Sequence, residues 1–467
     1  MSAEGLARAR QVMQDGGVPE QAIAVFERFY GELEAGATGM VHEADIEPLT
    51  DVPKLEQTAS TEAEQAAAMD VTAIIKLNGG LGTSMGMSQA KSLLPVHPGV
   101  TFLDIIARQV LAQRTALGAR LPLIFMNSFR TQADTLAALR RIDTELAGGN
   151  LAVDGVPLDF LQNREPKLRA DDLTPVSWPA DPSLEWCPPG HGDLYTALST
   201  SGVLETLLDK GFRYASVSNS DNLGASPSPR VAAWFAASGA PYAAEVCRRT
   251  PADVKGGYLV VRKSDGRLVL RETAQTPPED MAMADDINRH RYFHTNNLWF
   301  DLRVLKQTLD ERDGVLGLRL IRNEKTVDPT DKTSPKVIQI ESAMGAAVEV
   351  FDGATAIEVP RSRFLPVKTT NDLLLLRSDV YGFDDAERPV AKADPVPLVD
   401  LDPGYYKLID DFDARFPAGA PSLVQASALR VRGDWTFGAG VTVRGAVTLD
   451  DEGAPAKVDD GKTLGAE

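Results

Sequence analysis

The chain has 467 residues, of which 43% are hydrophobic, and a formal net charge of −18 that is concentrated in residues 1–70 and 450–467. It has no run of eighteen apolar residues and only two cysteines, which argues against a membrane span, a disulfide framework and a zinc site. Acidic ends also disfavour a nucleic-acid polymer as partner, so we expect a cytoplasmic protein with a large core and no membrane partner.

The chain begins with a segment that we predict to be helical. Apolar residues recur at helical spacing in residues 6–13 and 22–33. Small residues and glycines at 35–39 then interrupt the pattern, and an acidic, irregular stretch follows to about residue 65. We therefore predict a helical N-terminal segment over residues 1–70.

A glycine-rich loop follows the first predicted strand, the apolar run at residues 71–75. The sequence K-L-N-G-G-L-G-T-S-M-G occupies residues 76–86, and such a loop lets backbone N–H groups line an anion site. Lys91 lies too far beyond Gly86 for a Walker A loop, and the glycine spacing G-x-G-x-x-x-G does not match the dinucleotide fingerprint. The alternative is a turn between strand and helix that binds no ligand.

Short apolar strands alternate with helical runs from residue 71 onward. We predict strands at 121–126, 213–217 and 242–246, separated by helices such as 102–117 and 202–208. This alternation predicts an α/β fold with a mainly parallel sheet, whose ligands bind at the carboxyl ends of the strands. We assign residues 71–385 to a catalytic domain, with a β-hairpin at 257–270 in a β-rich insertion.

Polar clusters occur where these strands are expected to end. M-N-S at 126–128, Q-N-R at 162–164 and P-P-G-H-G-D at 188–193 each combine hydrogen-bonding groups with turn residues. In S-V-S-N-S-D-N, residues 216–222, Asp221 is placed to hold a hard divalent cation together with phosphate oxygens. An Asx turn is the alternative explanation for Asp221.

Two further segments suit a sugar phosphate. T-N-N-L-W at 295–299 puts two amides in a strand-like run, and amides suit sugar hydroxyls because they donate and accept hydrogen bonds. The run R-S-R-F-L-P-V-K-T-T, residues 361–370, holds three cations around an apolar centre, which favours a phosphate-binding Lys368 over a surface stripe of salt bridges.

The C-terminal part, residues 386–467, carries a short internal echo. V-R-G-x-x-T followed by an apolar residue occurs at 431–437 and again at 443–449. We predict that the two copies form two coils of a short parallel β-helix. Such a stub buries little by itself, so we expect it to pack on the catalytic domain or to mediate self-association.

Taken in order, these motifs resemble the eukaryotic-type UTP-glucose-1-phosphate uridylyltransferases, the UDP-glucose pyrophosphorylases. The similarity rests on the glycine loop, M-N-S-F, P-P-G-H-G-D, V-S-N-S-D-N-L-G-A, A-D-V-K-G-G, H-T-N-N-L-W and P-R-S-R-F-L-P-V-K-T-T. It implies a Rossmann-like, GT-A-like mixed sheet with helices on both faces. Two departures are visible: the family usually has Gly-Pro where this chain has Gln89-Ala90, and Asn where it has His294.

The resemblance also implies which residues form the site. The nucleotide contacts would be Leu77, Asn78, Gly79, Gly80, Lys91, Met126, Gln162, Gly190, Asn219 and Lys368. The sugar-phosphate contacts would be His191, Asn219, Asp221, Gly257, Glu272, Asn296 and Asn297. Asp221 would hold Mg²⁺, and Lys91 and Lys368 would be the catalytic cations that grip the phosphates.

The implied reaction joins UTP and glucose 1-phosphate into UDP-glucose and pyrophosphate, reversibly. An anionic phosphate oxygen attacks the α-phosphorus in line, so no protein general base is required. Sugar choice depends on contacts that motifs alone cannot rank, which leaves a broader UDP-sugar or UDP-N-acetylhexosamine pyrophosphorylase as the alternative. A non-enzymatic nucleotide-sugar sensor would need to have lost a lysine or the metal carboxylate, and this chain retains all three.

Overall fold

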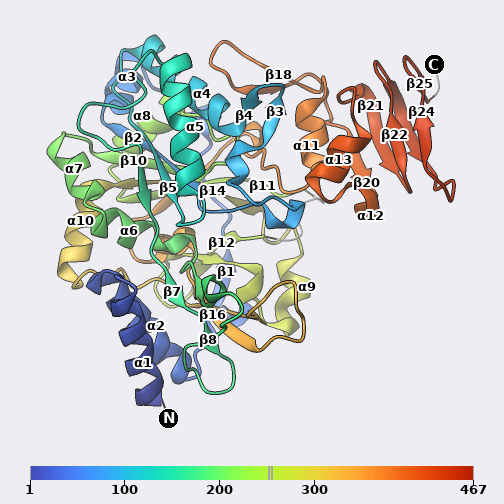
Figure 1. The fold of residues 1–467 in the computed structure, drawn as a ribbon. Helices are drawn as coiled ribbons and strands as arrows, with labels where there is room; N and C mark the ends of the chain where they lie inside the picture. The colour runs from blue at the N-terminus through green and yellow to red at the C-terminus, as the bar shows by residue number, and fades with distance from the viewer. Residues whose placement is uncertain (1, 251–252, 254–255, 466–467) are drawn as a thin grey trace.

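A computed structural model describes residues 2–250, 253 and 256–465 of the chain (Figure 1). Within these residues, ten strands form the central sheet, in which β1-β12-β14-β10-β2-β5-β6 are consecutive neighbours, β11 pairs with β14 and β17, and β13 pairs with β12. The strands are β1 (Ile46–Pro48), β2 (Thr72–Asn78), β5 (Leu123–Asn127), β6 (Asp159–Leu161), β10 (Tyr214–Asn219), β11 (Tyr242–Arg248), β12 (Tyr258–Arg262), β13 (Leu268–Arg271), β14 (Tyr292–Asp301) and β17 (Thr355–Glu358).

The centre of this sheet is parallel. β2 lies between β10 and β5 and is parallel to both, and β6 continues the parallel order beyond β5. β14 runs antiparallel to β10 and to β11, so the sheet as a whole is mixed. All seven residues of β2 are buried, because helices cover both faces of the sheet at this strand.

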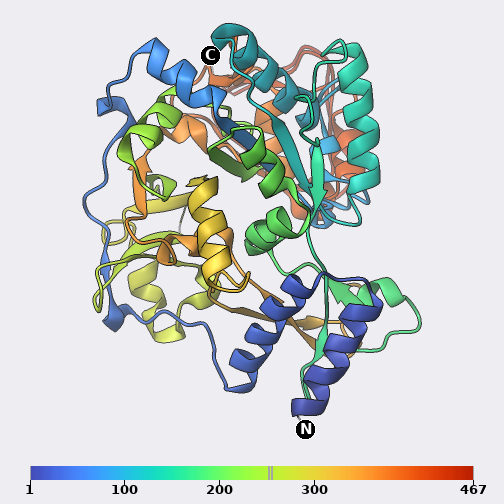
Figure 2. The ribbon, with the colours of Figure 1, turned by 90° about the vertical axis from the view of Figure 1, so that its left-hand side faces the viewer.

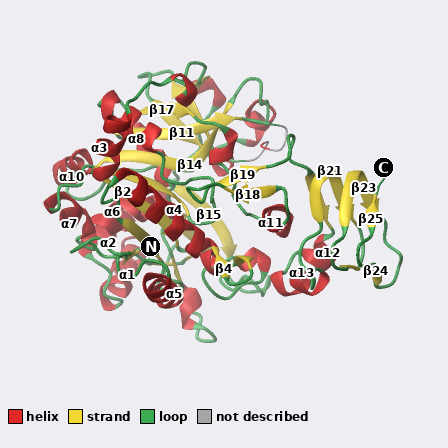
Figure 3. Ribbon diagram, turned by 90° about the horizontal axis from the view of Figure 1, so that it is seen from above, coloured by secondary structure: helices red, strands yellow, loops and turns green. Residues whose placement is uncertain are grey.

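Figures 2 and 3 show the helices arranged around the sheet. The helices are α1 (Ser2–Asp15), α2 (Glu20–Glu34), α3 (Glu62–Asp70), α4 (Phe102–Leu117), α5 (Gln132–Glu145), α6 (Leu194–Thr200), α7 (Val203–Asp209), α8 (Pro229–Ser238), α9 (Met281–Ala284), α10 (Leu302–Glu311), α11 (Thr370–Arg377), α12 (Pro403–Tyr406) and α13 (Ile409–Arg415). Side chains alternate along β2: Ile75 packs with the core under α2, α6, α7 and α10, and Ile74 with the core under α3, α4, α5 and α8. Helices on both faces of a mixed sheet are therefore confirmed.

The segment before residue 71 contains more than helices. α1 and α2 confirm the two helices expected there, and they lie at the lower end of the molecule in Figures 1 and 2. β1 then adds to the central sheet by pairing with β12, and α3 packs against α8. The stretch expected to be irregular thus contributes a strand and a helix to the body of the protein.

Short strand pairs decorate the main sheet. β12 and β13 form the expected antiparallel hairpin. β15 (Ile321–Thr326), β16 (Lys336–Glu341) and β8 (Leu168–Arg169) form a separate antiparallel sheet. The remaining pairs are β3 (Pro95–His97) with β4 (Val100–Thr101), β7 (Glu165–Pro166) with β9 (Trp186–Cys187), and β18 (Tyr381–Phe383) with β19 (Pro389–Ala391).

The C-terminal strands form two small parallel sheets at one end of the molecule (Figure 3). One sheet contains β20 (Leu398–Leu401), β21 (Ser422–Val431), β23 (Thr442–Leu449) and β25 (Thr463–Leu464), and the other β22 (Trp435–Phe437) and β24 (Ala456–Val458). The two V-R-G copies do not pair with each other residue for residue. Val431 pairs with Leu449, and the first copy continues into β22, whereas the second lies within β23.

In the part of the chain that the structure describes, no helix is long and apolar enough to cross a membrane. Both cysteines are free and buried.

Candidate functional site

The predicted nucleotide residues begin at the carboxyl ends of the parallel strands. Leu77 on β2 is paired in register with Met126 on β5 on one side and with Asn219 on β10 on the other. Three positions that are far apart in the sequence therefore lie side by side at one edge of the sheet. This is the edge at which open α/β sheets bind their ligands.

The glycine loop leaves this edge directly after β2. A Cβ added at Gly79 would lie 2.6 Å from Gln162 Oε1, so the two predicted nucleotide residues are immediate neighbours. Ser128 Oγ donates to the Gly79 carbonyl at 3.0 Å, and the Lys91 N–H donates to the Gly80 carbonyl at 3.1 Å. The loop is thus tied at both ends, and the second tie places Lys91 beside the glycines without the Gly-Pro pair that usually precedes it.

Lys91 and Asp221 form an ion pair, and the chain segment that leads into Lys368 is hydrogen-bonded to the Asp221 backbone. Lys91 Nζ binds Asp221 Oδ2 at 2.8 Å, and both side chains are about one-fifth exposed. The Val367 N–H donates to the Asp221 carbonyl at 3.1 Å, so the residue that carries the second cation follows directly. Three segments separated by more than a hundred residues each therefore meet beside the end of β10.

The other oxygen of Asp221 fits a metal ion. Asp221 Oδ1 is buried and has no hydrogen-bond partner among the residues that the structure describes. A buried carboxylate oxygen is costly to leave unpaired, so such an atom points to a ligand that completes it. A single carboxylate oxygen of this kind is compatible with Mg²⁺, which binds through one or two carboxylates and takes its other ligands from water or phosphate.

Lys368 faces the predicted sugar side. Its side chain is exposed, and its ammonium lies 5.9 Å from the centre of the Phe364 ring. A Cβ added at Gly257 would lie 2.7 Å from Glu272 Oε1, so the Glu272 carboxyl rests on the glycine backbone. Burial raises the pKa of Glu272, and the positive charge of Lys368 partly offsets this. These three predicted residues therefore form one group.

The P-P-G-H-G-D loop presents His191 in a defined tautomer. Gly190 has a φ of +77°, and a Cβ there would come within 2.6 Å of the Ser342 carbonyl, so glycine is required at this turn. His191 Nδ1 accepts the Met344 N–H at 3.0 Å, which leaves Nε2 as the N–H donor. Burial lowers the pKa of His191, so the ring is neutral at pH 7.

His294 stands where the family usually has Asn, next to the predicted sugar residues. Its backbone N–H donates to the Gly257 carbonyl at 2.9 Å, and its Nδ1 accepts the Asn296 N–H at 3.1 Å. Burial lowers the pKa of His294 to about 4, and its Nε2 has no hydrogen-bond partner among the described residues. Asn296 itself is half-buried with a φ of +57°.

The side-chain amides of two predicted contact residues, Asn78 and Asn297, have hydrogen-bond partners within the protein. Asn78 Nδ2 donates to Asn127 and Thr135, and its Oδ1 accepts from Ser220, so both ends of its side-chain amide are engaged within the protein. Asn297 was expected to touch the sugar. Its buried amide donates to Glu245 Oε2 at 3.1 Å and to the Arg363 carbonyl at 3.2 Å. Both amides support the site from behind because adjacent strand residues face opposite sides of a sheet.

The buried ion pair behind the site was not predicted from the sequence. Glu245 is fully buried in β11 and forms an ion pair with Arg363. One signal could have found it: Glu245 interrupts the apolar run of residues 242–246, and a carboxylate in a buried strand needs a cationic partner. Its partner could not be identified from the sequence, because Arg363 lies 118 residues away and the run 361–370 was interpreted as a phosphate-binding segment.

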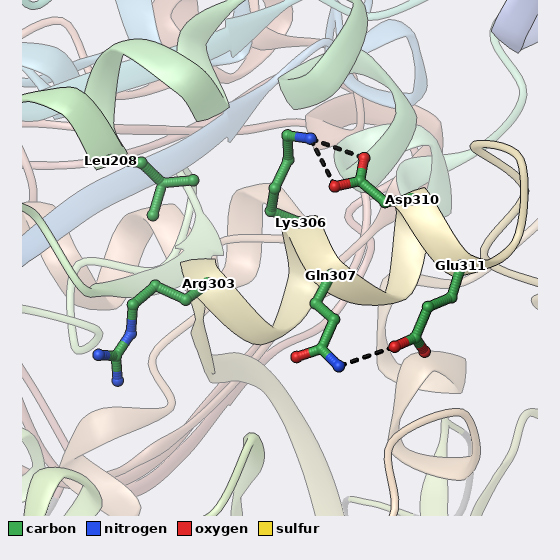
Figure 4. Close-up of a pocket in the computed structure, with 6 residues that line it drawn as sticks. All are labelled: Leu208, Arg303, Lys306, Gln307, Asp310 and Glu311. Atoms are coloured by element: carbon green, nitrogen blue, oxygen red, sulfur yellow. Dashed lines mark hydrogen bonds and ion pairs between the residues drawn. The ribbon is translucent and has the colours of Figure 1, made fainter.

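A surface pocket elsewhere does not share these features (Figure 4). It lies along α10, next to Leu208, where Lys306 Nζ binds both oxygens of Asp310 at 2.6 and 2.7 Å. Gln307 donates to Glu311 at 2.7 Å. Helix α10 begins directly after Asp301, which pairs with the first residue of β10, so this pocket lies at the opposite edge of the sheet from Asp221.

Comparisons with known proteins agree with this geometry. The family model for UTP–glucose-1-phosphate uridylyltransferase matches residues 23–444. A relative of that name from Solanum tuberosum is 38% identical over 458 residues, which cover 96% of this chain and 92% of the relative. A crystal structure of a Leishmania major UDP-glucose pyrophosphorylase variant in complex with UDP-glucose is 40% identical, with a TM-score of 0.90 over 98% of each chain.

A UDP-glucose phosphorylase structure from Trypanosoma brucei is similar to the same extent. It is 41% identical, with a TM-score of 0.88 over 99% of this chain and 98% of that one. The motifs, their convergence at one edge of the sheet and these full-length similarities all point the same way. The chain belongs to the UTP–glucose-1-phosphate uridylyltransferase family, the UDP-glucose pyrophosphorylases.

Proposed function

We propose that this protein is a UTP–glucose-1-phosphate uridylyltransferase, which forms UDP-glucose and pyrophosphate from UTP and glucose 1-phosphate and also runs in reverse. The observation that carries the proposal is the Lys91–Asp221 ion pair just beyond the carboxyl end of β10, with the segment that leads into Lys368 hydrogen-bonded to the Asp221 carbonyl. Two polyanionic substrates repel each other, and a site with two ammonium groups and a metal-binding carboxylate offsets that repulsion.

In this proposal the two lysines supply the positive charge that stabilises the phosphates. The phosphate oxygen of glucose 1-phosphate is already an anion, so it attacks the α-phosphorus without a protein base. Lys91 and Lys368 bind phosphate oxygens and stabilise the charge that develops on the α-phosphate and the leaving pyrophosphate. Lys91 Nζ lies 2.8 Å from Asp221 Oδ2, so its ammonium is already held beside the carboxylate that would bind the metal.

Mg²⁺ is the proposed cofactor, held by Asp221 through its unpartnered Oδ1. When bound, it supplies positive charge that neutralises the phosphates and orients them. The family assignment is consistent with a divalent metal, and the single carboxylate with an open oxygen supports Mg²⁺ in particular.

The base and the sugar occupy the two sides of this charged centre. We assign the nucleotide to the backbone of residues 77–80 with Met126, Gln162, Gly190 and Asn219, which share the edge formed by β2, β5 and β10. We assign glucose to Gly257, Glu272 and Asn296, with the neutral Nε2–H of His191 donating to a phosphate or nucleotide oxygen. The names of the relatives favour glucose over a broader range of sugars.

The finer fold assignments remain proposals. We propose that the parallel C-terminal strands are a short β-helix, supported by the pairing of β20, β21, β23 and β25 in one sheet and of β22 and β24 in another. Residues 1–70, 71–385 and 386–467 remain the proposed units around a Rossmann-like catalytic domain. Self-association through the last unit and a cytoplasmic location stay predictions, of which the first is tested by sedimentation of the purified protein.

A coupled assay tests the function. With UTP, glucose 1-phosphate and Mg²⁺, pyrophosphate and UDP-glucose should form together, and glucose 1-phosphate should be the best substrate in a panel of sugar 1-phosphates. No product, or a higher kcat/KM with an N-acetylhexosamine 1-phosphate, contradicts the proposal.

A further inference from the structure

A buried ion pair lies directly behind the loop that carries Asp221. The Arg363 guanidinium donates from Nε to Glu245 Oε2 and from NH2 to Glu245 Oε1, each at 2.7 Å. The side chain of Glu245 is 0% exposed and that of Arg363 is 11% exposed. A bidentate pair of this kind fixes the direction of both side chains as well as their distance.

The carboxylate of Glu245 is fully satisfied by its surroundings. Trp299 Nε1 donates to Oε1 at 3.0 Å, and Asn297 Nδ2 donates to Oε2 at 3.1 Å. Burial alone would raise the pKa of Glu245, but Arg363 and these donors outweigh it and lower that pKa. Glu245 is therefore charged and held rigidly inside the sheet.

A chain of hydrogen bonds leads from this pair to the proposed catalytic groups. Asn222 Nδ2 donates to the Arg363 carbonyl at 3.1 Å, and Asn222 Oδ1 accepts the Leu365 N–H at 2.8 Å. The Val367 N–H donates to the Asp221 carbonyl at 3.1 Å. The segment from Arg363 to Val367 is thus fastened to the Asp221 loop at three points, and Lys368 follows it.

The far side of the same loop is fastened from the sheet. Lys76 Nζ donates to Ser218 Oγ at 2.7 Å and to the Ala225 carbonyl at 2.8 Å. Arg363 NH1 donates to the Ser226 carbonyl at 3.1 Å. Arg363 consequently contacts both sides of the Asp221 loop, while its charge is balanced by Glu245 alone.

We propose that Glu245 and Arg363 are positioning residues for the transfer reaction, which hold segment 363–367 against the Asp221 loop and so fix where Lys368 stands relative to Asp221. Neither residue needs to touch a substrate for this. The inference rests on the proposed function, because it concerns the position of Lys368 relative to Asp221, and the proposed function gives both residues their roles. Misplacing a catalytic group by about 1 Å costs up to ~100-fold in rate.

Two variants test the proposal in the full-length protein. Glu245→Gln keeps the shape and the acceptor oxygen but removes the charge, and Arg363→Lys keeps the charge but removes the planar fork. We expect each to lower kcat at least about tenfold while the KM for UTP changes less than about threefold. The amide protons of Leu365 and Val367 should exchange faster with solvent in both variants.

The control is Asp301→Asn at the opposite edge of the same sheet. Asp301 is 4% exposed and binds Arg213 and Arg303, whose side chains are about half exposed, so the change disturbs the ion pairs of a buried carboxylate away from the site. It should leave kcat unchanged. A folded Glu245→Gln or Arg363→Lys variant with wild-type kcat overturns the proposal, as does an equal loss of kcat in Asp301→Asn.

A third variant covers the case in which the first two do not fold. Asn222→Ala leaves the ion pair intact but removes the hydrogen bonds to the Arg363 carbonyl and the Leu365 N–H. If the proposal is correct, this variant shows the same loss of kcat. A wild-type kcat in Asn222→Ala overturns the proposal. The wild-type protein, assayed in parallel, distinguishes a failure of the proposed function from a failure of the positioning role. If the wild type makes no UDP-glucose, the proposed function fails, whereas normal wild-type activity with unaffected variants refutes only the positioning role.

Discussion

The two edges of the central sheet treat a buried aspartate in opposite ways. Asp301, at the edge where β10 begins, caps α10 and accepts hydrogen bonds on both oxygens from Arg213 and Arg303. Asp221, just beyond the end of β10, has Lys91 on one oxygen and, among the residues that the structure describes, no hydrogen-bond partner on the other. The first carboxylate is satisfied by the fold, and the second is completed only by something that the fold does not supply.

The proposed function accounts for this difference, because a bound ligand would offset the loss of stability at Asp221. An unpaired buried oxygen destabilises the folded state, and it persists where a ligand later satisfies it. The pocket along α10 has its charges already paired, so it offers little to a phosphate. The two edges therefore differ more clearly in their unpaired polar atoms than in the presence of a surface pocket.

The largest effect is expected for Asp221→Asn. Because the amide cannot hold the metal as a carboxylate does, kcat for UDP-glucose formation should fall by about 1,000-fold, which corresponds to ~4 kcal/mol of transition-state stabilisation. Initial rates over a range of Mg²⁺ concentrations measure this. Asp301→Asn should keep wild-type rates; comparable losses in both variants would erase the contrast between the edges.

Lys368→Ala comes next. The ammonium stabilises charge that grows in the transition state, so kcat should fall by about 100-fold while the dissociation constant for UTP changes by only a few-fold. Turnover rates and calorimetric UTP binding measure the two quantities. The exposed Lys407→Ala, in the C-terminal part, is the matched control. Equal losses in turnover and in UTP affinity would contradict a transition-state role.

Gly257→Ala should act on the sugar alone. The added Cβ would lie 2.7 to 2.9 Å from atoms of the Glu272 carboxyl and would push it aside. We expect the KM for glucose 1-phosphate to rise about tenfold, as the loss of one charge-assisted hydrogen bond would cause, with little change in the KM for UTP. Gly31→Ala, where a Cβ meets no atom within 4 Å, is the control. An increase confined to the KM for UTP would show that Glu272 serves the nucleotide.

The smallest effect concerns pH and His294. The pKa of this buried ring is lowered from 6.5 to about 4, so the unfolded chain binds a proton in the pH range 4 to 6.5 that the folded chain does not. Stability is therefore full above pH 6.5 and declines as the pH falls toward 4. His294→Asn should reduce this decline by about 2–5 °C in Tm, measured by calorimetry at several pH values. His42→Asn, at an exposed histidine, should not; identical pH profiles for all three proteins would remove His294 from the account.

Local signals were read correctly from the sequence where they are strong. The helix expected at 102–117 has those bounds, because Thr101 and Asp104 form a capping box at its start and Gly118 ends it in the left-handed conformation. The strand at 71–75 and the loop after it were also found, since β-branched residues and clustered glycines are local properties. Asp221 was placed at the end of its strand for the same reason.

Long-range pairing could not be read in the same way. The V-R-G echo indicated a repeat, yet strand register is set by packing across the sheet, and Val431 pairs with Leu449 instead of with the second copy's valine. The hydrogen bonds of the Asn297 amide to Glu245 and to the Arg363 carbonyl could not be predicted either, because the sequence does not reveal which face of β14 a side chain takes. Arg363, the partner of Glu245, lies 118 residues away, and no local sequence pattern predicts a pairing over that separation.

A crystal structure of the protein with UDP-glucose and Mg²⁺ tests the central claim most directly. We predict that the metal binds Asp221 Oδ1 and that diphosphate oxygens lie within about 3 Å of the ammonium groups of Lys91 and Lys368. A diphosphate bound away from these three side chains, for example in the pocket along α10, would contradict the account.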